Sequence, residues 1–192
     1  MRLMLAVILV FGLAAGLGLG ATWWTVAHGL PVARLAIGPW RAEPDAGTLA
    51  ADPYERAGAA RRGEAPLAYG DGLPFTAETD DSGRPLDLAC DYALEGRLPN
   101  ARLWSLAAFQ PSGKPIESQG EPIGLNSANV VRTDDAPLRI ALSRDARPGN
   151  WQQLGGAGPF VLRLTLYDTT IGTPLDRADP DVLLAIRREG CR

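Results

Sequence analysis

Residues 160–167 read Phe-Val-Leu-Arg-Leu-Thr-Leu-Tyr, and this stretch decides the fold class. One set of alternate positions holds only large apolar side chains: Phe160, Leu162, Leu164 and Leu166. The other set is mixed: Val161, Arg163, Thr165 and Tyr167. Successive side chains of an extended strand point to opposite faces, so this alternation predicts a β-strand with one face on a hydrophobic core.

Several other segments of the chain show a similar pattern of apolar residues. We predict strands at 73–79, 86–94, 102–109, 137–143 and 183–186, with less regular segments at 126–132 and 150–151. Turn sequences rich in Gly, Pro, Asp and Asn separate them, for example 80–85, 96–100 and 111–114. Short strands with turns about every 8–12 residues favour an all-β, antiparallel, jelly-roll-like β-sandwich over residues 66–192.

Composition narrows the classes of function. The 192 residues are 46% apolar and 21% charged with a net charge of −3, so neither disorder nor a nucleic-acid partner is expected. A Ser-His-Asp triad would need the one histidine, His28, which lies beside an apolar N-terminal segment. With two cysteines and one histidine, the chain cannot assemble a Cys/His zinc cluster. We assign no catalytic residue, metal or cofactor.

The first 27 residues predict a transmembrane anchor. Residues 3–27 contain no Asp, Glu, Lys or Arg, and as a helix they span about 37 Å, enough to cross a hydrocarbon core of about 30 Å. Trp23 and Trp24 lie near the end of the segment, where interfacial aromatic residues belong. A cleaved signal peptide is the alternative, which the length of the apolar run disfavours.

Three glycines in this segment, Gly12, Gly16 and Gly20, are spaced by four and share one helix face. Such a face lets a second helix approach closely, which suggests self-association. The alternative is that glycine is simply common in membrane helices.

Residues 28–65 read as a connector that contains one short helix. Glycines and prolines are frequent in 28–50, and Asp52-Pro53 can cap and begin a helix that Gly63 and Pro66 end.

Cys90 and Cys191 are predicted to form a disulfide bond, because a cysteine pair in an anchored domain fits an oxidising compartment. Two independent buried thiols are the alternative. Flanking arginines do not decide the orientation of the anchor. The cysteines therefore point to a single-pass protein of the inner (cytoplasmic) membrane with a periplasmic domain.

The order of several motifs resembles the domain family of unknown function numbered 1214. These motifs are Trp104-Ser105-Leu106, Leu125-Asn126-Ser127, Asn150-Trp151, Gly158-Pro159-Phe160 and Leu164-x-Leu166-Tyr167. Two earlier segments, Ile37-Gly38-Pro39-Trp40 and Asp52-Pro53-Tyr54, are typical of a short, membrane-anchored bacterial branch of the family. The match covers roughly residues 85–190. The resemblance implies a jelly-roll-like sandwich and a companion domain, numbered 1254, which precedes this one in longer relatives. It implies no activity.

The polar and aromatic residues in these motifs are candidates for a ligand or partner surface: Asn126, Ser127, Asn150, Trp151, Arg163 and Tyr167. The alternative, which we favour, gives them structural roles in turns and packing.

Two classes of function lead, and a purely structural domain that packs against itself through the glycine face is a third possibility. The first is a non-enzymatic envelope domain that binds a protein carrying the companion domain. The second is an envelope hydrolase or carbohydrate-active enzyme that uses turn carboxylates, from Asp80/Asp81, Asp134/Asp135 and Asp176/Asp179/Asp181. Adjacent aspartates in turns are far more often solvated turn formers, so we favour the binding domain.

Overall fold

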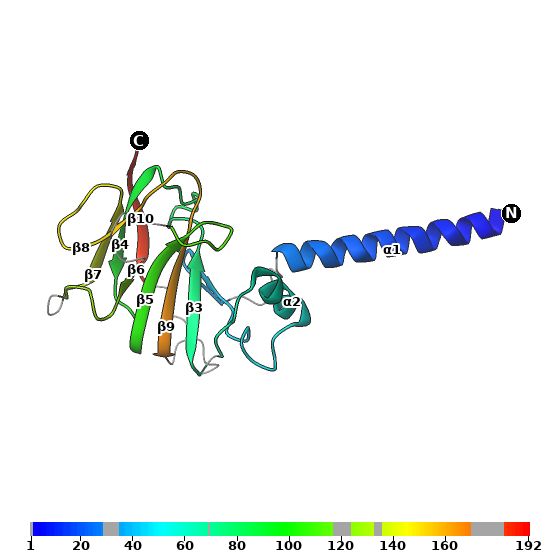
Figure 1. Ribbon diagram of the computed structural model, residues 1–192, viewed down its shortest axis with the longest axis horizontal. Helices are drawn as coiled ribbons and strands as arrows, with labels where there is room; N and C mark the ends of the chain where they lie inside the picture. Colours follow the sequence, from blue (N-terminus) through cyan, green and yellow to red (C-terminus); the bar gives the residue numbers. More distant parts are fainter. Residues whose placement is uncertain (1, 29–34, 69, 117–123, 133–135, 170–182) are drawn as a thin grey trace. The chain divides into compact units, whose positions relative to one another are not determined.

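The computed structural model describes residues 2–28, 35–68, 70–116, 124–132, 136–169 and 183–192 (Figure 1). The chain divides into two compact units. One comprises Met1–Ala33 and Asp45–Pro66, and the other comprises Arg34–Pro44 and Leu67–Arg192.

The first unit is helical, with α1 (Arg2–His28) and α2 (Pro53–Arg62). The stretch Arg2–Ala27 of α1 has a mean hydropathy of 2.5 and none of its most apolar window is buried. It is long and apolar enough to cross a membrane, as an anchor or as a signal sequence. On α2, the carboxylate of Asp52 accepts a hydrogen bond from the Tyr54 N–H at 2.8 Å, and Gly63 ends the helix with a φ of 66°. Both ends lie where the sequence predicts them.

The second unit contains two β-sheets. The order of the six-stranded sheet is β1 (Leu35–Ile37), β2 (Trp40–Ala42), β3 (Gly72–Ala77), β9 (Val161–Thr169), β5 (Ala101–Phe109) and β6 (Gly124–Asn126). The order of the four-stranded sheet is β10 (Ala185–Cys191), β4 (Cys90–Gly96), β7 (Leu138–Ser143) and β8 (Asn150–Gln153). Figure 1 shows β3, β9 and β5 side by side, as their pairing requires.

One hydrophobic core joins the two sheets. On β9, Leu162, Leu164 and Leu166 are completely buried in the core. Between them, Arg163 is partly exposed on the outer face, and Thr165 is buried. Tyr92 of β4 packs edge-on against Phe160, with 5.7 Å between ring centroids. The mainly β fold and the alternation predicted for residues 160–167 are therefore confirmed.

Residues 35–42 differ from the expected connector, because β1 and β2 form a hairpin on the edge of the six-stranded sheet. Gly38 adopts a φ of 55° in the turn, a conformation that glycine tolerates easily. The Trp40 side chain is 1% exposed, and its Nε1 donates to the Leu184 carbonyl at 2.7 Å. Burial of Ile37, Trp40 and Ala42 fixes this segment to the β unit.

Strand β8 also departs from the expected all-antiparallel arrangement, because it pairs with β7 in parallel, with Asn150 beside Ile140. Residues 144–149 carry the chain back along β7. The Trp151 Nε1 donates to the Ser143 hydroxyl at 3.0 Å and thereby holds the returning strand against the end of β7.

Candidate functional site

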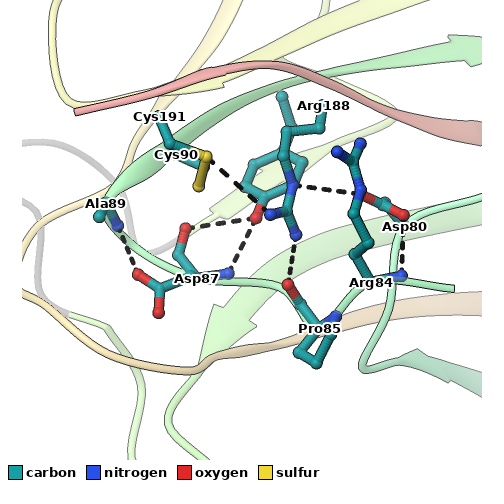
Figure 2. The surroundings of a disulfide bond; sticks show 9 residues. Asp80, Arg84, Pro85, Asp87, Ala89, Cys90, Arg188 and Cys191 are labelled. Carbon is teal, nitrogen blue, oxygen red and sulfur yellow. Dashed lines mark hydrogen bonds and ion pairs between the residues drawn. A yellow bond between two sulfur atoms is a disulfide. The ribbon is translucent and has the colours of Figure 1, made fainter. Parts of the chain in front are cut away.

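The two cysteines of the chain form a disulfide bond at the edge of the four-stranded sheet (Figure 2). Cys90 begins β4 and Cys191 ends β10, and the two residues are direct partners in the antiparallel ladder. The bond therefore ties the C-terminal strand to a strand about 100 residues earlier in the chain.

A buried carboxylate with two arginines lies close to this disulfide (Figure 2). Asp80 is 1% exposed, and one of its carboxylate oxygens lies 3.1 Å from the Nε atoms of both Arg84 and Arg188. The other oxygen accepts hydrogen bonds from the backbone N–H groups of Ser82 and Arg84, at 2.9 and 3.1 Å. Asp80 thus joins the 80–84 turn to β10.

This environment determines the protonation of Asp80. Burial by itself raises the pKa of the Asp80 carboxyl. The backbone N–H groups of Arg84 and Ser82 and the charges of Arg84 and Arg188 outweigh burial, so the pKa lies below its ordinary value. A general acid of a glycosidase needs a raised pKa. Asp80 therefore suits an ion-pair network and does not suit that role.

Arg188 extends the network to Tyr92 and Pro85. Its guanidinium lies 5.4 Å from the centroid of the Tyr92 ring and donates to the Pro85 carbonyl. The Tyr92 hydroxyl accepts from the Asp87 N–H at 2.8 Å. Burial raises the pKa of the Tyr92 phenol, which therefore stays neutral. Together these contacts connect β10, β4 and residues 80–87, and they therefore stabilise the fold.

The six predicted surface residues lie on both sheets. Arg163 and Tyr167 face outward from the six-stranded sheet, and Asn126 lies on the same face, since it pairs with Ser105. Ser127 follows directly, and its N–H donates to the Trp104 carbonyl. Asn150 and Trp151 belong to β8 in the four-stranded sheet. The six residues are therefore divided between the two sheets.

Most of their polar atoms are used by the fold itself. The Asn126 carboxamide oxygen accepts from the Ala128 N–H at 2.8 Å. The Asn150 carboxamide accepts from the Val131 N–H at 2.7 Å and donates to the Val131 and Arg139 carbonyls at 2.9 and 3.1 Å. On the outer face of β9, the Arg163 guanidinium lies 4.8 Å from the centroid of the Phe109 ring.

Of the other carboxylate candidates, the structure describes only Asp81. Asp134, Asp135, Asp176, Asp179 and Asp181 lie outside the described residues. Asp80 and Asp81 line an open cavity of about 540 Å³ together with Glu95, which pairs with Arg139 at 2.8 Å and Arg187 at 3.6 Å. No group of three or more His, Cys, Asp or Glu side chains in the described part of the chain could hold a metal ion.

A second open cavity, of about 580 Å³, lies between the β4–β5 connection and the beginnings of β7 and β8. Arg97, Trp104, Arg132, Arg139 and Asn150 contribute to its lining. Of these, sequence reasoning selected only Asn150. Arg97 and Arg132 lie in turn or irregular segments, where a single arginine gives no signal of its own.

Comparison with solved structures identifies a relative of known fold. The crystal structure of the VPA0106 protein from Vibrio parahaemolyticus is 17% identical, with a TM-score of 0.56 over 72% of this chain and 36% of that chain. The chain thus spans about a third of that protein's length. The crystal structure of an uncharacterized protein from Burkholderia cenocepacia matches with 21% identity and a TM-score of 0.39, over 62% of this chain and 29% of the other. None of the curated proteins compared with the chain matches it.

The family model for the protein of unknown function DUF1214 matches residues 71–171. This match begins and ends earlier than the range expected from the resemblance, roughly residues 85–190. The matched stretch contains β3 to β9 and includes strands of both sheets. It covers more than half of the 192 residues. The chain therefore belongs to the DUF1214 family.

Proposed function

We propose that this protein is a non-enzymatic binding domain, held at the outer face of the inner (cytoplasmic) membrane by α1 and acting with a separate protein that carries the companion 1254 domain. The observation that carries the proposal is the comparison with the Vibrio protein, in which the matched fold accounts for 36% of a longer chain. In this chain, the part before the matched residues holds the apolar helix, α2 and the β1–β2 hairpin.

The first support for an anchor is the exposure of α1. Apolar residues lie on every side of this helix, and none of its most apolar window is buried by the rest of the chain. A helix that is apolar all round needs lipid or protein around it. The Cys90–Cys191 disulfide favours an oxidising compartment for the β unit, which on an inner-membrane protein is the periplasmic side.

The second support concerns the surface available to a partner. On the outer face of the six-stranded sheet, the Leu103 side chain is 49% exposed and lies opposite Tyr167. Tyr167 and Arg163 lie on the same face, so it combines apolar, aromatic and charged side chains, as protein interfaces do. Confinement of both partners to one membrane surface raises their effective concentration, so a modest interface suffices.

The partner hypothesis is tested by photo-crosslinking in native membranes. A photoreactive residue replaces Leu103 in the full chain, and a matched variant carries it at Arg187, on the other sheet and also exposed. We expect an adduct with a companion-domain protein from position 103 and not from position 187. An adduct with a protein that lacks this domain, or no protein adduct from position 103, contradicts the proposal.

The location is tested separately with reporters fused after Arg192. Alkaline phosphatase becomes active only when exported, whereas green fluorescent protein exported in unfolded form does not fluoresce. We expect an active phosphatase that remains in the membrane fraction after washing at high pH. A fluorescent fusion places the β unit in the cytoplasm, and a phosphatase released as a soluble, shortened chain shows that α1 is cleaved.

A further inference from the structure

The charged side chains in the described lining of the cavity of about 580 Å³ are all positive. Its described lining contains three arginines, Arg97, Arg132 and Arg139, and no aspartate or glutamate. Arg139 already pairs with Glu95 at 2.8 Å and Glu189 at 3.1 Å. No ion pair joins Arg97 or Arg132 to any other residue in the described ranges. In the described part of the lining, Arg97 and Arg132 therefore carry positive charge that no carboxylate neutralises, which favours an anion.

Trp104 adds a hydrogen-bond donor without an acceptor. Its side chain is 3% exposed and belongs to the cavity lining, and its buried Nε1 has no partner in the described part of the chain. The other two tryptophans of the β unit differ, since Trp40 donates to Leu184 at 2.7 Å and Trp151 donates to Ser143 at 3.0 Å. A buried N–H without an acceptor is rare and costly, so a ligand that reached it through a small shift of the Trp104 side chain would gain a hydrogen bond.

The rim of the cavity is held in place before any ligand binds. The Asn150 carboxamide accepts a hydrogen bond from the Val131 N–H at 2.7 Å and donates one to the Val131 carbonyl at 2.9 Å. The same carboxamide donates to the Arg139 carbonyl at 3.1 Å. These bonds fix the segment that presents Arg132 against β7, and a pre-ordered site loses less entropy on binding.

The walls set the size and polarity of the ligand. Leu98, Pro137 and Leu138 supply apolar surface beside Trp104, and the volume lies in the range of small-molecule sites. Guanidinium groups match carboxylates through paired hydrogen bonds. We propose that this cavity binds a small organic carboxylate, with its anionic group paired to Arg97 and Arg132 and its apolar body against Leu98, Trp104 and Leu138.

The test uses isophthalate, a water-soluble aromatic dicarboxylate, and its uncharged analogue isophthalamide. Binding to the full chain in lipid nanodiscs is measured by ligand-observed NMR, with empty nanodiscs as the blank. We expect saturable binding of isophthalate at one site and weaker binding of isophthalamide. The double variant Arg97→Gln/Arg132→Gln should weaken isophthalate binding by about tenfold, since each exposed charge pair contributes a few-fold.

The matched control is Arg144→Gln, an exposed arginine outside the cavity lining, which should bind isophthalate like the wild type. Trp104→Phe keeps an aromatic wall and removes Nε1, and it should weaken binding a few-fold. Urea midpoints of all variants establish that they are folded. Three outcomes overturn the proposal: no saturable binding to the wild type, equal binding by the Arg97/Arg132 variant, or equal binding of the uncharged analogue.

Discussion

Removal of the disulfide should strongly destabilise the β unit. The bond joins residues 101 positions apart in the chain. In the chain-entropy model, a cross-link that closes a loop of about 100 residues stabilises the folded state by about 4.7 kcal/mol. The cross-link acts mainly on the unfolded chain, while burial of Leu184 and Ile186 still holds β10 to the core. We therefore expect Cys90→Ala/Cys191→Ala to fold with a free energy of unfolding lower by about 3–5 kcal/mol.

The assay is urea unfolding of the full chain in nanodiscs, followed by tryptophan fluorescence. Oxidised wild type, reduced wild type and the double alanine variant are compared, and mass spectrometry counts the free thiols in each. Reduced wild type and the variant should unfold at nearly the same urea concentration, well below oxidised wild type. A difference of less than about 1 kcal/mol between oxidised wild type and the variant refutes the reasoning, because the unfolded chain would then gain little freedom.

Hydrogen exchange separates this global effect from a local one. The Arg192 N–H donates to the Ala89 carbonyl at 3.0 Å, directly beside the disulfide. In the variant this amide should lose protection first, whereas the completely buried Ile186 should exchange only through global unfolding. Equal loss at both positions would show that the disulfide alone holds β10 in the sheet.

Three further predictions concern other parts of the chain. Asp80→Asn should lower the free energy of unfolding at neutral pH by about 2–4 kcal/mol, because Arg188 loses its buried partner. Since the pKa of Asp80 is lowered in the folded protein, its contribution to the free energy of unfolding is present above the ordinary pKa and lost as pH falls below about 4. The free energy of unfolding of the variant should therefore change less with acid pH than that of the wild type. Asn150→Ala removes three hydrogen bonds and should lower the free energy of unfolding by about 1–3 kcal/mol, measured by urea unfolding against wild type. If α1 self-associates through its glycine face, Gly16→Leu should reduce energy transfer between labelled copies in vesicles by about half. Gly18→Leu, on another face of the helix, is the control. Equal energy transfer in both variants contradicts self-association through the glycine face.

The parts of the fold that the sequence predicts well are those with long periodic signals. Residues 160–167 alternate over eight positions, and β9 follows them closely. Helix α2 begins and ends where Asp52 and Gly63 predict, because cap residues act locally. On β5, apolar residues on both faces are typical of an interior strand, and β5 lies between β9 and β6, although Leu103 is about half exposed.

Features that depend on distant partners could not be predicted in this way. The strands β1 and β2 have three residues each, too short for a periodic signal, and burial of Trp40 depends on Leu184 far along the chain. Asp80 begins a turn sequence that reads as solvated, yet it is buried because Arg188 reaches it from the last strand. Local propensity carries no information about a partner more than 100 residues away.

The same distinction applies within the family motifs, two of which contribute Trp104 and Asn150 to the lining of the cavity. The Asn126 and Asn150 side chains hydrogen-bond to nearby backbone groups, so these two side chains hold turns and strands in place. Arginines such as Arg188 and Arg139 are likewise used in ion pairs within the fold. What distinguishes the cavity is polar groups that the described fold leaves unused, above all the Nε1 of Trp104. Groups of this kind can bind a ligand without first breaking a bond that holds the fold together, so the search for an activity should begin at this cavity.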